Sequence, residues 1–201
     1  MRYRILTLRD NENSDPTTLV KNIEKNLGLI EDHDNKVFGV FGSLLGLATN
    51  EVYLVTFGED DFSLDLDSHI KIASRRTFKP TARPTIHQPA KEAGIYVFRW
   101  FNVDPAEIDE IVRLSADAWP SFESSFETRV QGLFAEDTDA PLTMLLVTWY
   151  ANLTVWEQSR HPPPEAKENF LRRHKLTLSA LPVATRLIPI AQSGSLSKSK
   201  S

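Results

Sequence analysis

Hydrophobic residues along the chain follow two spacings, one typical of strands and one typical of helices. Residues 95–101 read Ile-Tyr-Val-Phe-Arg-Trp-Phe, a run rich in the aromatic and β-branched residues that favour strands. After Asp104-Pro105 the apolar residues Ile108 and Ile111 lie three positions apart, which predicts a helix with one buried face. Asp is a preferred N-cap and Pro suits the first helical position, so this pair predicts where the helix begins.

The same two elements occur in the same order near the N-terminus. Residues 3–8 predict a strand, and Asp15-Pro16 predicts the start of a helix. The apolar residues of that helix again have helical spacing, and Gly28 is expected to end it. These apolar residues are Leu19, Val20, Ile23 and Leu27.

Two later strands match between the halves of the chain. Residues 37–41 read Val-Phe-Gly-Val-Phe and residues 130–134 read Val-Gln-Gly-Leu-Phe, an offset of 93 residues. Residues 54–57 read Leu-Val-Thr-Phe and residues 146–149 read Leu-Val-Thr-Trp, an offset of 92 residues. Because both the letters and the spacing are kept, the sequence indicates a tandem repeat.

A second helix and a last strand complete each predicted repeat. The helices are expected within residues 62–76 and 153–175, and Pro162–Pro164 must interrupt the second of them. The last strands are expected at residues 82–85 and 180–183. The order strand, helix, strand, strand, helix, strand is that of a ferredoxin-like βαββαβ unit, an antiparallel sheet with its helices on one face.

Strand 95–101 is apolar on both of its faces, so the face of the sheet away from the helices must also be buried. We therefore predict an α+β fold in which two tandem ferredoxin-like βαββαβ repeats form one pseudo-dimeric α/β-barrel. The expected divisions are a first repeat at 1–88, a linker at 89–93, a second repeat at 94–191 and a disordered tail at 192–201.

Composition narrows the classes of function. The net charge of −4 provides no basic face for nucleic acid, and the lack of cysteine excludes disulfides, thiolate catalysis and cysteine-ligated metals. The apolar start of the chain soon meets Arg9-Asp10, and no apolar run reaches the length of a membrane span. We expect a cytoplasmic protein with no nucleic-acid or membrane partner, and leave a homodimer open.

The run Tyr96–Pro105 resembles the opening strand of NIPSNAP-family domains, in which a Tyr-x-Leu-Arg-x-Tyr run leads to a helix started by Pro. Residues 46–53, Gly-Leu-Ala-Thr-Asn-Glu-Val-Tyr, resemble the Gly-x-x-Asn-x-Val segment of the same family. The resemblance spans most of residues 2–190 and implies the dimeric α/β-barrel superfamily, here with two units fused in one chain.

That superfamily includes small cofactor-independent monooxygenases, haem-degrading enzymes, polyketide cyclases and muconolactone-type isomerases. NIPSNAP domains supply no defined catalytic residues to transfer, so the resemblance leaves the catalytic residues of this chain unknown. The halves also differ, since Leu6 stands in the first half where the second has Arg99. We therefore expect a ligand pocket in the second half, which carries the charged Arg99 and all four tryptophans as stacking surface.

Arg99 is the sharpest candidate for a binding residue. It lies in the middle of a strand between aromatic neighbours, where burial of an unpaired charge would be costly. One interpretation is a clamp for an anion or enolate, because a guanidinium can fork onto a carboxylate. The other interpretation is that Arg99 forms a structural ion pair, or that its side chain extends to the rim of the barrel and is solvated there.

The other candidates each have a structural alternative. Tyr96, Trp100 and Trp149 could stack on a planar ligand, or they could simply form core. His69 and His161, 92 residues apart, could act as bases or as a haem ligand, or they could be ordinary exposed histidines. None of the five histidines has metal-ligand spacing, so we expect neither a metal nor a cofactor.

Three functional hypotheses follow from these residues and the resemblance. The first is a NIPSNAP-like protein that binds a small apolar or aromatic ligand between sheet and helices. The second is a cofactor-independent monooxygenase, cyclase or isomerase. The third is a protein-interaction module without a pocket. A cavity of several hundred cubic ångströms with Arg99 or a histidine at its wall would favour the first two.

Overall fold

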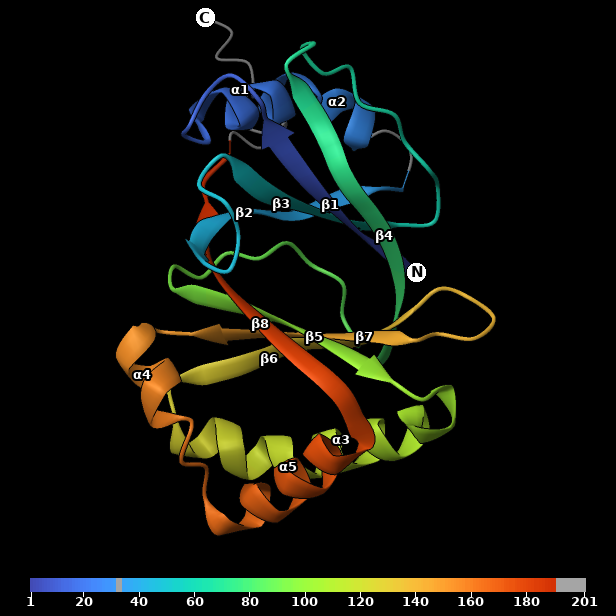
Figure 1. The fold of residues 1–201 in the computed structure, drawn as a ribbon, viewed down its shortest axis with the longest axis vertical. Coiled ribbons are helices and arrows are strands. Elements are labelled where there is room, and N and C mark those ends of the chain that lie inside the picture. The colour runs from blue at the N-terminus through green and yellow to red at the C-terminus, as the bar shows by residue number, and fades with distance from the viewer. Residues whose placement is uncertain (32–33, 191–201) are drawn as a thin grey trace, which may run out of the picture.

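The computed structural model describes residues 1–31 and 34–190, so the predicted tail at 192–201 lies outside the described residues. The described part of the chain contains eight strands, with helices after the first, fifth and seventh of them (Figure 1). The strands are β1 (Arg2–Asp10), β2 (Lys36–Leu45), β3 (Glu51–Gly58), β4 (Ile70–Arg83), β5 (Ile95–Val103), β6 (Thr128–Glu136), β7 (Thr143–Tyr150) and β8 (Thr177–Ile188). The helices are α1 (Thr17–Lys25), α2 (Leu27–Ile30), the 3-10 turn η1 (Pro105–Glu107), α3 (Ile108–Ser125), α4 (Leu153–Gln158) and α5 (Pro164–Leu176).

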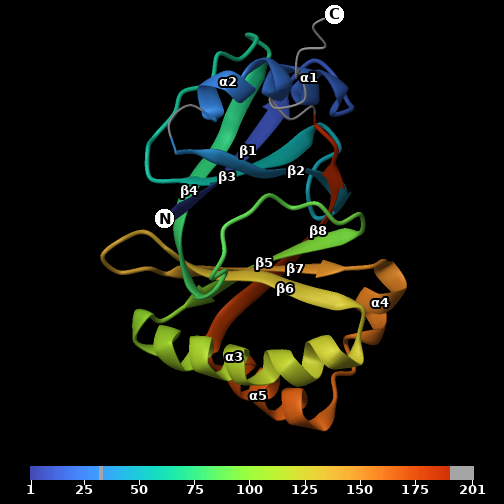
Figure 2. The ribbon, with the colours of Figure 1, turned by 180° about the vertical axis from the view of Figure 1, so that it is seen from behind.

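All eight strands form one closed antiparallel barrel in the order β1-β3-β2-β8-β5-β7-β6-β4. Each half contributes four neighbouring strands in the same relative order, β4-β1-β3-β2 and β8-β5-β7-β6. The pairs β2–β8 and β4–β6 join the halves. Figures 1 and 2 show α1 and α2 at one end of the molecule and α3, α4 and α5 at the other, with the barrel between them. The predicted α+β pseudo-dimeric barrel is confirmed.

The helix predicted within residues 62–76 is wrong. Residues 61–67 contain neither helix nor strand, and β4 begins at Ile70. Phe62, Leu64 and Leu66 alternate with polar residues, and this period of two lets an extended segment place all three against the apolar outer face of the first sheet. This segment covers the surface that a second helix would cover in a complete ferredoxin-like unit.

The other predicted elements are observed, with changes at their ends. The predicted stop at Gly28 is wrong, because α1 ends at Lys25 and Gly28 lies inside the short helix α2. The Asp104 carboxylate accepts a hydrogen bond from the Ala106 N–H at 3.0 Å, as an N-cap should. Pro162–Pro164 separate α4 from α5 as expected. β8 contains the predicted strand 180–183, whereas β4 ends at Arg83 and contains only the first two residues of the predicted strand 82–85.

Strand β5 is buried on both faces, as its sequence predicts. Tyr96 and Phe98 point into the barrel and belong to an aromatic core that both halves build. Val97 and Phe101 point the other way and pack under the helices of the second half. No helix in the described part of the chain is long and apolar enough to cross a membrane.

Candidate functional site

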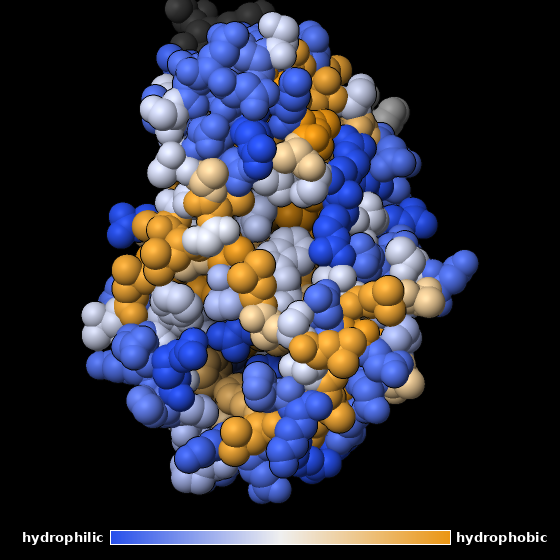
Figure 3. Space-filling view, viewed as in Figure 1, coloured by the Kyte–Doolittle hydropathy of each residue, from blue (hydrophilic) through white to orange (hydrophobic). Residues whose placement is uncertain are grey.

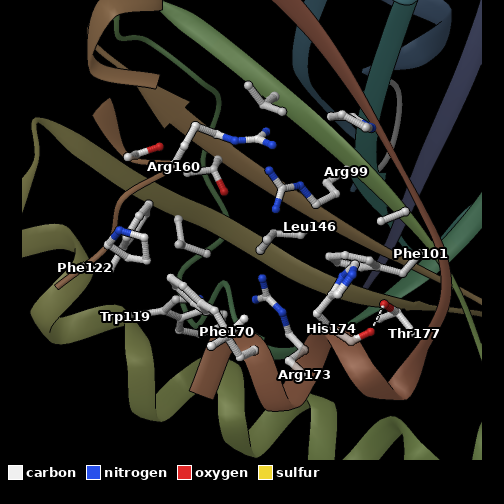
Figure 4. Close-up of a pocket in the computed structure, with 18 of the residues that line it drawn as sticks. Arg99, Phe101, Trp119, Phe122, Leu146, Arg160, Phe170, Arg173, His174 and Thr177 are labelled. Carbon is white, nitrogen blue, oxygen red and sulfur yellow. Dashed lines mark hydrogen bonds between the residues drawn. The ribbon is translucent and has the colours of Figure 1, made fainter. Parts of the chain in front are cut away.

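The outer face of the second sheet and the helices that cover it enclose a cavity of about 460 Å³. Figure 3 shows the molecule hollowed in its lower half, where hydrophilic and hydrophobic side chains both border the hollow. Aromatic side chains from β5, α3 and α5 supply much of the wall, and three arginines point into the space (Figure 4). We call it the arginine cavity. The side chains that define it here are Arg99, Phe101, Trp119, Phe122, Tyr150, Arg160, Phe170 and Arg173.

Arg99 enters the cavity because of its position in β5. Successive side chains of a strand point to opposite faces, so Arg99 lies on the same face as Val97 and Phe101, toward the helices. It is partly buried. Its cross-strand neighbours, Leu146 on β7 and Pro182 on β8, have apolar side chains.

Arg173 reaches the same space from α5. Ala166, Phe170 and Arg173 recur four and three positions apart, which places all three on the face of α5 that packs inward. Only 6% of Arg173 is exposed. Its Nη1 donates a hydrogen bond to the Ser115 hydroxyl at 3.2 Å, and its guanidinium lies over the rings of Phe170 and Phe101, at 4.7 and 5.5 Å from their centroids.

No carboxylate balances these charges. Among the described residues, no Asp or Glu lines the arginine cavity, and none forms an ion pair with Arg99 or Arg173. Burial lowers the pKa of Arg99; Tyr150 opposes this shift and the charge of Arg160 adds to it. Burial, followed by the charge of Arg99, lowers the pKa of Arg173 to about 9. A guanidinium stays protonated at pH 7 in proteins, so both side chains are charged and no carboxylate of the described residues serves as their counterion.

Further cations surround the opening of the cavity. These are Arg160 and Lys167, and both are exposed to solvent. In Figure 4 the guanidinium groups of Arg160 and Arg99 point toward one another. The cavity is thus positively charged both at its floor and at its mouth.

Tyr150 is the main neutral polar group near the arginines. Only 5% of it is exposed, and burial raises the pKa of its hydroxyl although the charge of Arg99 acts in the opposite direction. The hydroxyl therefore remains protonated at neutral pH. It can donate a hydrogen bond to an anionic or carbonyl oxygen bound beside Arg99.

The aromatic candidates of the sequence lie on the other side of the sheet from Arg99. Tyr96 is fully buried inside the barrel and donates its hydroxyl hydrogen bond to the Glu92 carbonyl at 3.0 Å. Trp100 and Trp149 pack against the same interior core, and the indole N–H of Trp149 donates to the Ala93 carbonyl at 3.0 Å. The structure thus places these three residues in core, apart from the cavity that Arg99 lines.

The two histidine candidates do not meet, and they are not equivalent in the two halves. His69 lies just before β4, where its Nε2 is 3.7 Å from a carboxylate oxygen of Asp10. His161 is exposed in the loop between α4 and α5. His69 precedes strand β4 and His161 precedes helix α5, so their offset of 92 residues in the sequence does not place them at equivalent positions in the two halves. Of the six candidates, only Arg99 lines the arginine cavity.

The sequence interpretation missed Arg173, Arg160 and Tyr150 as partners of Arg99. A signal for Arg173 was present, because a charged residue occupies an inward helical position after Ala166 and Phe170. Arg160 carries no such signal, since its direction depends on the loop that follows α4. Among the described residues, no group of three or more His, Asp or Glu side chains could hold a metal ion.

No protein-family model matches the chain, and no curated protein matches it. Several solved structures, in contrast, are similar to this chain in fold. A proposed monooxygenase from Lactobacillus acidophilus is 12% identical, with 95% of this chain and 96% of that chain covered and a TM-score of 0.58. An anthrone oxidase-like protein is also 12% identical, with 94% and 92% covered and a TM-score of 0.58. These proteins share the fold of this chain.

A NIPSNAP family protein from Agrobacterium tumefaciens is also similar in structure, at 15% identity and a TM-score of 0.42. The comparison covers 53% of this chain and 96% of that chain. Solved structures similar to this chain thus include a NIPSNAP family protein as well as the proposed monooxygenase and the anthrone oxidase-like protein. At these identities the likeness describes a fold and assigns no activity.

Proposed function

We propose that the protein binds a small anionic molecule with an apolar or aromatic body in the arginine cavity. The observation that carries this proposal is the convergence of Arg99 and Arg173 in a largely apolar space without a carboxylate among the described residues. A buried charge with no counterion costs several kcal/mol in the free protein. A bound carboxylate, phenolate or enolate would supply that counterion.

The size and lining of the cavity support a ligand of this kind. Its volume of about 460 Å³ lies within the range of ordinary small-molecule sites. Phe101, Phe122 and Phe170 provide apolar surface for a planar body, while the two arginines would fix the charged end. The module without a pocket is not supported, because the sheet and helices of the second half are not closely packed everywhere.

The test is calorimetric titration of the full chain with 2-naphthoate and with the neutral 2-naphthamide. We expect the carboxylate to bind and the amide to bind far more weakly. Arg99→Leu should weaken 2-naphthoate binding by about 10- to 100-fold, the value of one or more lost charged hydrogen bonds. The fold should survive, because leucine suits an apolar strand and no carboxylate is left unpaired.

Arg172→Leu is the matched control. Arg172 precedes Arg173 on α5 but faces solvent, where it binds Glu110. Its replacement removes the same charge and should leave the affinity for 2-naphthoate unchanged. Equal binding of carboxylate and amide, or equal losses in the two variants, would refute the proposal.

A second candidate function is the stabilisation of an enolate formed from the ligand. Arg99, Arg173 and the protonated Tyr150 hydroxyl could together stabilise a developing oxyanion in a site of low dielectric. One structural match that covers nearly the whole chain is named an anthrone oxidase-like protein, which suggests anthrone as the first substrate to try. The measurements are deuterium exchange into anthrone and oxygen consumption. Catalysis requires rates above buffer that Arg99→Leu abolishes and Arg172→Leu preserves.

A further inference from the structure

We propose that the ligand of the arginine cavity carries two anionic groups on one apolar body, and that Arg160 binds the outer group. This inference rests on the proposed function, because it names the class of molecule that the same cavity takes. It depends on how the cations are arranged from the floor of the cavity to its mouth.

The cations form an inner and an outer set. The inner set is Arg173, which is 6% exposed, and the partly buried Arg99. The outer set is Arg160 and Lys167, both exposed at the opening. Four cations thus line one cavity in which the described residues place no carboxylate. A ligand with a single negative charge would leave most of this repulsion uncompensated.

The direction of Arg160 is the most informative feature. Its backbone N–H donates to the Glu157 carbonyl at 3.0 Å, which holds the residue at the end of α4. Its side chain is exposed and forms no ion pair with any described residue, yet it points toward the like charge of Arg99 rather than away from it (Figure 4). The charge of Arg160 lowers the pKa of Arg99, so the two groups do interact.

An anionic group between Arg160 and Arg99 would convert this repulsion into two attractive contacts. A second anionic group would occupy the inner position beside Arg173, whose guanidinium has only the Ser115 hydroxyl as a hydrogen-bond partner among the described residues. Phe122 and Phe170, from α3 and α5, would then contact the apolar body that separates the two groups. Terephthalate-like or naphthalene-2,6-dicarboxylate-like molecules have this distribution of charge.

The experiment compares three probes on the full chain by calorimetry: 2-naphthoate, naphthalene-2,6-dicarboxylate and 1-naphthyl phosphate. The dicarboxylate should bind wild type at least about tenfold more tightly than the monocarboxylate. In Arg160→Gln this ratio should fall below about threefold, because only the dicarboxylate carries a second group for Arg160 to bind, so its affinity should fall by more than the affinity for 2-naphthoate. Arg172→Gln, which removes an exposed charge outside the cavity, should keep the wild-type ratio.

Three other outcomes would contradict the inference. A dicarboxylate that binds no more tightly than 2-naphthoate overturns the inference and leaves the proposed function intact. Naphthyl phosphate that binds as tightly as the dicarboxylate overturns the assignment of two separate groups, since its charges share one head group. A failure of all three probes to bind overturns the inference and the proposed function together.

Discussion

Within the described part of the chain, the guanidinium of Arg173 has one hydrogen-bond partner, the Ser115 hydroxyl, and lies over two aromatic rings. These contacts are weak compensation for an ionised group that is almost fully removed from water. Ser115 itself donates to the Ile111 carbonyl at 2.7 Å, so it keeps a partner when Arg173 is replaced. The position of Arg173 is therefore better explained by ligand binding than by a contribution to the stability of the folded protein.

Arg173→Met tests this explanation through stability. Methionine fills similar apolar space and removes the uncompensated charge, so the free energy of unfolding of the ligand-free protein should rise by about 1–4 kcal/mol. Urea unfolding measures it. Arg172→Met, on the solvent side of α5, should change stability by less than about 1 kcal/mol. A clear loss of stability in Arg173→Met alone would show that the folded protein already compensates the charge.

Asp10 gives a residue-scale prediction about pH. Its buried carboxylate accepts hydrogen bonds from the backbone N–H groups of Glu12 and Asn13, at 2.9 and 3.0 Å, and from the Asn13 side chain at 2.9 Å. Burial by itself raises the pKa of Asp10, but these bonds and the nearby His69 outweigh it and hold that pKa below its usual value.

A carboxyl whose folded-state pKa is depressed adds stability above its unfolded pKa of about 4, and loses it as pH falls through the folded value. Asp10→Asn should therefore cost about 1–3 kcal/mol at pH 7. The difference from wild type should shrink steadily below about pH 4. Urea unfolding of both proteins from pH 7 to pH 3 checks this. A difference that does not depend on pH would contradict the role given to the charge.

At the scale of elements, strands β2 and β6 have similar sequences because each has a glycine at a β-bulge and a phenylalanine two residues later. Each has an irregular register with its neighbour, at Val37/Gly39 in one half and at Val130/Gly132 in the other. A Cβ on either glycine would collide with the phenylalanine ring two residues later, at 2.8 Å for Gly39 and 2.3 Å for Gly132. The glycine lets that ring lie over the backbone at the bulge.

Gly132→Ala should destabilise the protein by about 1–3 kcal/mol, because Phe134 is buried among other aromatic rings and has little room to move. Gly28→Ala is the control. Nothing lies within 4 Å of a Cβ added at Gly28, which is helical, so alanine there should stabilise by about 0.5–1 kcal/mol. Thermal melts of the two variants should shift in opposite directions. Equal shifts would refute the explanation of the repeat.

At the scale of the whole molecule, one chain closes the barrel that single-unit relatives are expected to complete with two chains. Every strand has two neighbours, so the described part of the chain presents no free sheet edge for a partner strand. We therefore expect a monomer in light scattering. A homodimer would have to use the helices or the loops.

The division at residues 88 and 94 remains a proposal that truncation can test. Residues 1–88 alone would expose interior aromatic residues such as Tyr3, Phe41 and Tyr53 and would lose both inter-half strand pairings. We expect this segment to self-associate when expressed alone. Coexpressed with residues 94–201, it should elute as a 1:1 complex in size-exclusion chromatography with light scattering. A soluble, monomeric 1–88 segment would refute this view of the barrel.

The sequence by itself determined the α+β barrel, the strand order within each half and the burial of both faces of β5, because these depend on local periodicity and on matched spacing. It also supported Arg99, since a charge in an apolar strand is visible without a structure. The sequence did not determine the secondary structure of residues 62–76, where apolar residues that alternate with acidic ones form an extended segment followed by β4 instead of the predicted helix.

Only the tertiary structure decided which side chains join Arg99. Strand alternation separates it from Tyr96 and Trp100, whereas the packing of α5 on the sheet brings Arg173 to the same cavity from more than seventy residues away in the sequence. The path of the chain after α4 likewise directs Arg160 inward. These are contacts between distant elements, and their geometry depends on how helices and sheet pack, which no local pattern of residues encodes.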